Sequence, residues 1–154
     1  MNAEKIVQLL RDRRETITCA ESITGGALTS ALVSIPGASH VLRGSIVAYS
    51  SEVKIQELNV DSALIEEKGV VSEEVALAMA TGVKNKFSAT WAVASTGVAG
   101  PGASHGIPAG TVWLALLGPG VQETVKLEIT GEREMVRRGA VESALGVLER
   151  ILSA

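Results

Sequence analysis

The feature that most constrains the fold is a repeated change of hydrophobic pattern along the chain. Short apolar runs of the kind that form buried strands alternate with longer segments whose apolar residues recur every three or four positions. The strand-like runs lie at 16–20, 45–49 and 91–95. This alternation predicts an α/β fold with a largely parallel sheet that helices cover on both faces.

Helical spacing and capping residues locate the helices between these runs. Helices are predicted around Ile6–Leu10, from the turn at 25–26 to about Ile35, from about Glu52 to Leu58, from Ser72 through Phe87, and from about Glu132 to Leu152. The fourth helix has a predicted buried stripe of Val75, Met79, Val83 and Phe87. The last helix has one of Val136, Ala140, Ala144 (or Ser143), Val147 and Ile151.

The last third of the chain adds an antiparallel element. Residues 111–117 and 121–129 flank Gly118-Pro119-Gly120, which predicts a C-terminal β-hairpin and makes the sheet mixed but mostly parallel. The run at 45–49 shows little alternation, so we expect it to be buried on both faces.

Length and charge limit the classes of function. A chain of 154 residues fits one domain over 1–154, and no apolar run approaches the roughly 18 residues of a membrane span. The net charge is −3, which argues against a nucleic-acid partner. The single cysteine, Cys19, allows no internal disulfide, and the N-terminus lacks the apolar segment of a signal peptide. We therefore expect a cytoplasmic protein that binds no membrane.

Polar side chains follow each of the three predicted strands. They are Glu21-Ser22, Tyr49-Ser50-Ser51 and Ser95-Thr96-Gly97. Ligands of open α/β sheets bind outside the carboxyl ends of the strands, so these residues converge on one cleft if the strands are neighbours.

The sequence lacks the residue patterns of several kinds of catalytic and metal-binding site. His40 and His105 are far apart without partners at metal-ligand spacing, so no metal or other cofactor is expected. His105 lies in a predicted glycine-rich loop, which argues against a Ser-His-Asp triad, and there is no Walker A sequence, so lysine is left as the candidate base. The pattern Ser51-Glu52-Val53-Lys54 places a serine and a lysine on one helix face. Its alternative interpretation is a capping serine and an exposed lysine, which such a short pattern favours.

The stretch CAESITGG at 19–26 has two interpretations of its own. Ser22 and Thr24 can cap the following helix, or they can face a ligand. Gly25 and Gly26 can expose backbone N–H groups to a phosphate, and Gly97, Gly100 and Gly102 allow backbone to approach a ligand closely. Arg133 and Arg137, four apart in the last helix, can meet an anion or form a solvated face.

Several separated motifs resemble one family when taken together and in order. They are AESITGG, AYSSEVK, GVVSEEVA, STGVAGPG, GTVW and VRRGAVESAL, and they extend the likeness from about Ala3 to Leu152. The sequence resembles the CinA C-terminal-domain family, in particular its stand-alone nicotinamide mononucleotide deamidases. The resemblance implies a three-layer α/β/α fold with a mixed sheet, and a homo-oligomer.

The resemblance also implies a reaction, the hydrolysis of the carboxamide of nicotinamide mononucleotide without a metal. It places the nucleophile on Ser22, a tyrosine on Tyr49 and a lysine on Lys54. It further implies a role for Thr96 and for Arg137 or Arg138. On this basis the substrate-binding residues are expected to be Glu21, Thr24, Gly25, Gly26, Thr96, Gly97, Gly100 and Arg137.

Physical chemistry gives these residues roles. A serine needs a base, and a lysine can serve only when burial lowers its pKa. Tyr49 can relay a proton between Ser22 and Lys54 or orient the lysine through its phenol oxygen, and backbone N–H groups beside Gly25-Gly26 or Thr96-Gly97 can hold an oxyanion. Glu21 can bind ribose hydroxyls or hold the turn.

Departures from the family pattern keep two alternatives open. They lie at Ile23, Ser51, 103–106 and Glu132, mostly in predicted ligand loops. The first alternative is a nucleotide-binding or regulatory module with weak catalysis. The second is a serine amidase for another small amide, with Ser51 as a candidate nucleophile.

Overall fold

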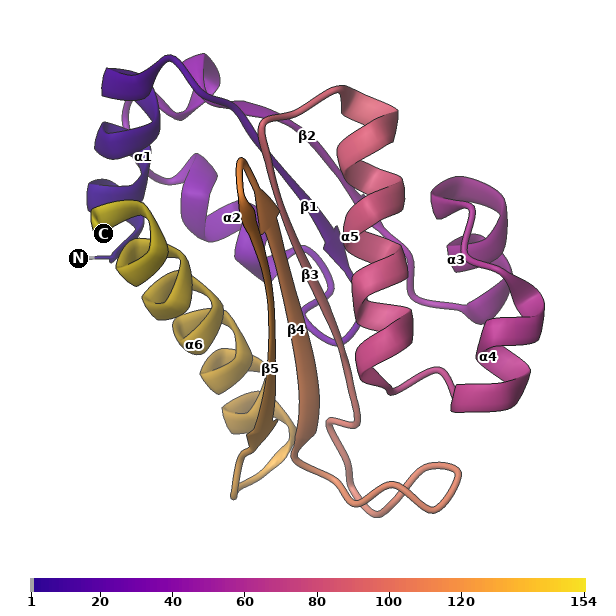
Figure 1. Cartoon of the computed structure of the whole chain (residues 1–154). Helices are drawn as coiled ribbons and strands as arrows, with labels where there is room; N and C mark the ends of the chain where they lie inside the picture. The colour runs from indigo at the N-terminus through magenta and orange to yellow at the C-terminus, as the bar shows by residue number, and fades with distance from the viewer. Residues whose placement is uncertain (1) are drawn as a thin grey trace.

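The computed structural model describes residues 2–154, which form a five-stranded sheet between two layers of helices (Figure 1). The strands, in spatial order, are β2 (Leu42–Val47), β1 (Ile17–Glu21), β3 (Trp91–Gly97), β4 (Thr111–Gly118) and β5 (Val121–Glu128). Strand β1 pairs in parallel with β2 and β3, whereas β3–β4 and β4–β5 are antiparallel. The predicted mixed sheet and the C-terminal hairpin are confirmed.

The helices divide between the two faces of the sheet, as Figure 1 shows. One face carries α1 (Asn2–Arg13), α2 (Ala27–Val33) and α6 (Arg133–Ser153), and a short 3₁₀ helix (Ala38–His40) follows α2. The other carries α3 (Ser51–Leu58), α4 (Ser62–Lys68) and α5 (Glu73–Phe87). The three-layer α/β/α arrangement is therefore confirmed. Within residues 2–154 no helix combines the length and the apolar character needed to cross a bilayer.

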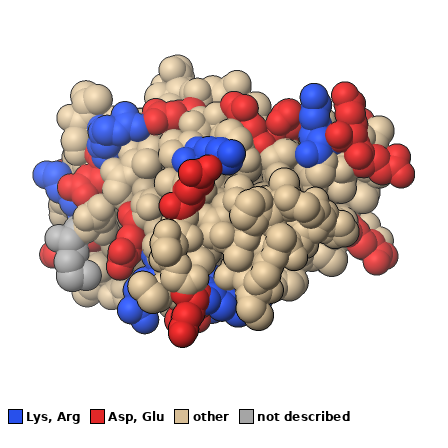
Figure 2. Space-filling model, turned by 90° about the horizontal axis from the view of Figure 1, so that it is seen from below, with Lys and Arg blue, Asp and Glu red and all other residues tan. Residues whose placement is uncertain are grey.

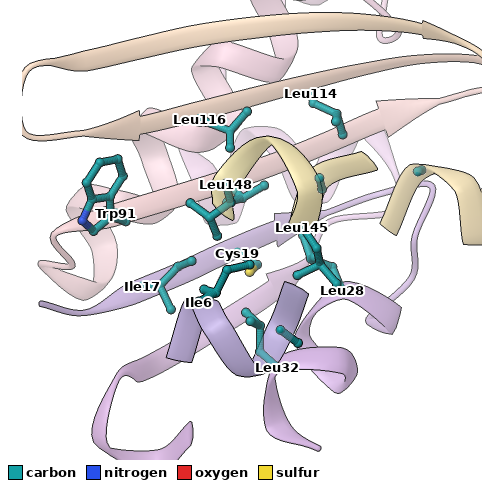
Figure 3. Close-up of a cluster of buried hydrophobic side chains, with 14 of the residues drawn as sticks. Ile6, Ile17, Cys19, Leu28, Leu32, Trp91, Leu114, Leu116, Leu145 and Leu148 are labelled. Atoms are coloured by element: carbon teal, nitrogen blue, oxygen red, sulfur yellow. The ribbon is translucent and has the colours of Figure 1, made fainter. Parts of the chain in front are cut away.

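Two buried clusters, one on each face, hold these layers together. Neighbouring strand residues point to opposite faces, so Cys19 joins the cluster under α1, α2 and α6, and Ala20 joins the cluster under α5. Figure 3 shows the first cluster, in which large aliphatic side chains meet from the sheet and the three helices. The second is rich in alanine, so α5 lies close to the sheet. Helix α5 also lies close to α3. At Gly82 there is no room for a side chain, since a Cβ would lie 1.9 Å from the Leu58 carbonyl oxygen.

Three sequence predictions differ from the structure. Strand β2 is an edge strand whose residues are mostly half-buried, because it pairs with β1 alone, so the expectation of burial on both faces is wrong. Helix α4 was not predicted, although Asp61 caps it through the Ala63 N–H at 3.0 Å. In α6, Leu148 and Leu152 are buried more fully than Val147 and Ile151, because the apolar stripe of a helix is wider than one line of residues.

The start of α2 is fixed by a buried carboxylate. Glu21, the last residue of β1, has no exposed surface, and its two oxygens accept from the backbone N–H groups of Gly26, Leu28 and Thr29 at 2.9–3.1 Å. The Thr29 hydroxyl donates to the same carboxylate at 2.5 Å. Gly25 and Gly26 have φ angles of +57° and +101°, which let the chain curl back over this carboxylate. The carboxylate thus satisfies N–H groups that a helix start otherwise leaves unpaired.

Replacing Glu21 with glutamine is expected to destabilise the fold. The substitution removes the charge and turns an NH₂ group toward backbone donors, so we expect a loss of about 2 kcal/mol or more in the free energy of unfolding. Urea denaturation measures this loss, with Glu66→Gln at an exposed position of α4 as the matched control. Equal stability of Glu21→Gln and the wild type would show that Glu21 does not anchor this turn.

Candidate active site

The carboxyl ends of three neighbouring parallel strands meet at one edge of the sheet. Strands β2, β1 and β3 lie side by side, with Glu21 paired to Val47 on one side and to Ser95 on the other. The residues that follow them, Ser22 and Tyr49, and the end of β3 at Thr96-Gly97 therefore lie together. Figure 2 views the molecule from below Figure 1, where this edge lies, and shows scattered charges around a broad uncharged area. The sequence predicted one cleft on condition that the three strands are neighbours, and the strand order meets that condition.

Ser22 and Lys54 form a hydrogen-bonded pair at this edge. Lys54 Nζ lies 2.9 Å from Ser22 Oγ, and it also donates to the carbonyl oxygens of Ala48 at 2.7 Å and Tyr49 at 3.2 Å. Lys54 is 1% exposed and Ser22 is 8% exposed. Local sequence puts the lysine there, because the Ser50 hydroxyl caps α3 through the Val53 N–H and so turns position 54 toward the sheet.

Burial changes the acid–base chemistry of this lysine. Removal from water lowers the pKa of Lys54 from 10.5 to about 8, because an apolar environment disfavours the ammonium. The contacts suit the neutral amine as well, since two N–H groups can remain on the two carbonyls while the lone pair faces the Ser22 hydroxyl. The arrangement can therefore accept the serine proton.

The short pattern at 51–54 includes the lysine of the observed pair, but its serine is not the one that contacts this lysine. Ser51 opens α3 and is absent from the hydrogen bonds of Lys54, which reaches Ser22, 32 positions away in the sequence. The alternative interpretation of an exposed lysine is wrong for Lys54. Spacing along one helix cannot indicate a partner that another strand supplies.

Tyr49 lies at the rim, with its side chain turned away from the pair. The residue is 62% exposed, and its phenol oxygen accepts from Arg133 Nη2 at 3.1 Å. The backbone carbonyl of Tyr49, and not its phenol, contacts Lys54. Among residues 2–154, the phenol of Tyr49 makes no hydrogen bond to Ser22 or Lys54 that would support the predicted relay or orientation of the lysine.

The turn after Ser22 is built by internal contacts. The N–H groups of Gly25 and Gly26 donate to the Ser22 carbonyl and to Glu21, so both groups that were expected to face a phosphate or an oxyanion have partners within the turn. Glu21 is buried and holds the turn, in line with the second of its two alternatives. Thr24 is buried too, and its hydroxyl pairs with that of Ser95 at 2.8 Å. These expected substrate contacts instead position Ser22.

Arg137 braces the same turn from outside. Its Nε and Nη2 donate to the carbonyl oxygens of Ile23 and Thr24 at 3.1 Å, and its Nη1 pairs with Glu134 at 3.0 Å. A Cβ on Gly25 would lie 3.3 Å from this guanidinium, so the turn fits closely against it. All three nitrogens thus have partners within the protein, and the contacts of Arg137 in this structure hold the turn.

The end of β3 forms the opposite wall. The Thr96 hydroxyl donates to the Val70 carbonyl at 2.9 Å, which ties the strand to the loop before α5. A Cβ on Gly97 would lie 2.7 Å from the Thr111 carbonyl oxygen and 2.9 Å from Ile23 Cδ1, so only glycine fits there. Gly100 has φ +90° and turns the chain into the loop that closes this side.

These walls enclose a cavity of about 340 Å³, within the range of small-molecule sites. Its lining consists of Ser22, Ile23, Tyr49, Lys54, Val70, Val71, 96–104 and Arg133. It thus includes Thr96, Gly97 and Gly100 from the predicted set and brings in Arg133. A larger hollow of about 810 Å³ lies between α3 and α5, but none of these residues lines it. Among residues 2–154 no three His, Cys, Asp or Glu side chains are placed to hold a metal ion together.

Comparison with known proteins identifies the family. The model of the CinA C-terminal domain matches residues 1–152. A CinA-like protein of Frankia casuarinae is 43% identical over 148 residues, which are 96% of this chain and 34% of the relative. A CinA-like protein of Gloeobacter violaceus is 44% identical over 138 residues, with shares of 88% and 32%. The chain thus spans about a third of the length of these curated relatives.

Solved structures agree with this match. The competence damage-inducible protein A of Klebsiella pneumoniae superposes with a TM-score of 0.96 at 33% identity, covering 99% of this chain and 95% of that one. The competence/damage inducible protein of Agrobacterium tumefaciens gives a TM-score of 0.90 at 30% identity, covering 100% and 97%. The resemblance seen in the sequence motifs is confirmed, and this chain belongs to the CinA C-terminal domain family.

Proposed function

We propose that this protein hydrolyses the carboxamide of nicotinamide mononucleotide to nicotinate mononucleotide and ammonia. The observation that carries the proposal is the 2.9 Å contact between Ser22 Oγ and a buried Lys54 Nζ, in a cavity sized for a small molecule. The substrate follows from the resemblance to the stand-alone deamidases of the family. The geometry itself favours acyl transfer by an activated serine.

The first half of the reaction forms an ester. Ser22 Oγ attacks the carboxamide carbon while its proton passes to the neutral amine of Lys54. The C–N bond of the tetrahedral intermediate then breaks. The departing nitrogen takes the proton from Lys54 and leaves as ammonia. What remains is the nicotinoyl ester of Ser22 and a neutral lysine.

The second half returns the enzyme to its starting state. Water attacks the ester carbon and gives a proton to Lys54, and the carbon–oxygen bond to Ser22 breaks. Ser22 Oγ recovers the proton from Lys54, and the product acid releases its remaining proton to solvent and leaves as a carboxylate. The backbone N–H of Ile23 makes no hydrogen bond to residues 2–154, so it is our candidate to stabilise the oxyanion in both halves.

Replacing Ser22 or Lys54 is expected to remove the activity. Ser22→Ala should lower ammonia release from nicotinamide mononucleotide at least about a thousandfold, because it deletes the nucleophile. Lys54→Met, which keeps an apolar stem in the buried site, should lower it at least about a hundredfold. The matched control is Ser51→Ala, for which full activity is expected.

Two outcomes of the same ammonia assay would contradict this assignment. Full turnover by Ser22→Ala would remove it as nucleophile, and loss of activity only in Ser51→Ala would transfer that role. Binding of the nucleotide without ammonia release by the wild type would indicate a binding module, and release from other small amides alone would indicate a different amidase.

The pH dependence of kcat/KM should report the lysine. Its pKa is lowered to about 8, and the reaction needs the neutral amine in the free enzyme. We therefore expect kcat/KM to rise about tenfold per pH unit below pH 8 and to level off above it. Steady-state assays from pH 6 to 10 measure this, and a flat profile across pH 8 would contradict a lysine base.

A further inference from the structure

Arg133 is a cation at the cavity rim whose hydrogen-bond partners are all neutral. Its Nη1 donates to the Gly100 carbonyl at 2.6 Å, and its Nη2 donates to the Tyr49 phenol oxygen at 3.1 Å. By contrast, Arg137 and Arg150 each meet a carboxylate. The side chain of Glu134, next to Arg133, is engaged by Arg137. The positive charge of Arg133 is thus available to something that enters the cavity.

The charge of the cavity points the same way. Among residues 2–154, Lys54 and Arg133 are the only charged residues that line it, and no aspartate or glutamate does. Lys54 is buried against Ser22 and belongs to the reacting end, whereas Arg133 is exposed at the mouth. A ligand that fits this distribution carries an uncharged reacting group at one end and an anionic group at the other.

Tyr49 adds a second donor at the same place. Its phenol oxygen accepts from Arg133, while its own O–H proton has no acceptor among residues 2–154. One anion bound to the guanidinium can therefore also receive the Tyr49 proton. The forked N–H groups of an arginine match phosphate oxygens and form stronger bonds with them than with neutral acceptors, so an entering phosphate can displace the Gly100 carbonyl.

We propose that Arg133 and Tyr49 form the subsite for the phosphate of the substrate. This rests on the proposed function for the identity of the ligand, and it assigns Tyr49 to binding and not to proton transfer. It also moves the phosphate from Arg137, whose nitrogens hold the turn behind Ser22, to the arginine one helical turn earlier.

Paired substrates with and without the phosphate test the subsite. We compare KM and kcat for nicotinamide mononucleotide and nicotinamide riboside, which share the carboxamide and the ribose. Arg133→Ala should raise KM for the mononucleotide about tenfold to a hundredfold, and Tyr49→Phe about fivefold, because a charged and a neutral donor are lost. Neither variant should change KM for the riboside more than about twofold or lower kcat for either substrate.

Two variants are controls for other basic groups. Arg138→Ala removes an exposed arginine of the same helix that does not line the cavity, and no change is expected. Lys68→Ala removes a lysine beside a smaller hollow of about 120 Å³, which shares Val70, Val71 and Ser104 with the cavity. A selective loss with Lys68→Ala would overturn the proposal in favour of that hollow.

Other results also overturn it. If Arg133→Ala affects both substrates equally, Arg133 only holds the loop at Gly100 in place. If Tyr49→Phe lowers kcat for both substrates and leaves KM unchanged, Tyr49 takes part in proton transfer. Persistence of the KM ratio between the two substrates in Arg133→Ala would likewise place the phosphate elsewhere.

Calorimetry separates this subsite from the proposed reaction. Nicotinate mononucleotide and nicotinate riboside are products, so their binding needs no turnover. Arg133→Ala should weaken the first at least about tenfold and leave the second unchanged. If the wild type releases no ammonia but shows this selective loss, the reaction fails and the subsite stands. Equal binding of the mononucleotide to wild type and Arg133→Ala overturns the subsite whatever the turnover.

Discussion

The burial of the Lys54 amino group is the constraint on which the site depends. A lysine taken out of water normally needs a carboxylate partner, yet its described contacts are two backbone carbonyls and a serine hydroxyl. That environment keeps the nitrogen satisfied as an amine and disfavours the ammonium. The pKa of Lys54 falls toward neutrality for this reason alone. The same burial places Nζ against Ser22. The packing of Lys54 therefore both lowers its pKa and sets its position relative to the serine.

The turn that presents Ser22 is held from both sides by opposite charges. Glu21 lies beneath it and binds N–H groups at the start of α2, while Arg137 lies outside and binds the carbonyls of Ile23 and Thr24. Carboxylates favour a helix N-terminus, and guanidinium groups favour carbonyl oxygens, so each charge is placed where the backbone suits it. The sequence motif at 19–26 thus combines the proposed nucleophile with Glu21, one of the two groups that hold its turn in place.

Local patterns predicted most of the fold because they record burial directly. The apolar strand runs, the cap at Ser72 and the stripe of Val75, Met79 and Val83 are all visible in the order of residues. The status of β2 as an edge strand was not predicted, because position within a sheet depends on strand order. Helix α4 was not predicted because its seven residues make too few turns for a recognisable hydrophobic periodicity.

The site was predicted less completely, for a related reason. Resemblance indicated Ser22 and Lys54, whose contact joins two distant segments and leaves no trace in local spacing. A glycine turn with a nearby arginine looks the same whether it binds a phosphate or is held by the protein's own Glu21 and Arg137. Only the tertiary structure shows that these charged groups already hold the turn, whereas Arg133 contacts neutral acceptors at the cavity rim.

Burial of Lys54 makes the proposed mechanism possible, because it gives a lysine that can act as a base at physiological pH. Titration of the Lys54 side-chain ¹³Cε resonance by NMR tests it most directly, with the resonance assigned by its loss in Lys54→Met. We expect a midpoint at about pH 8. A midpoint at the ordinary lysine value of 10.5 or above would contradict it, because Lys54 would then be an ammonium throughout the neutral range.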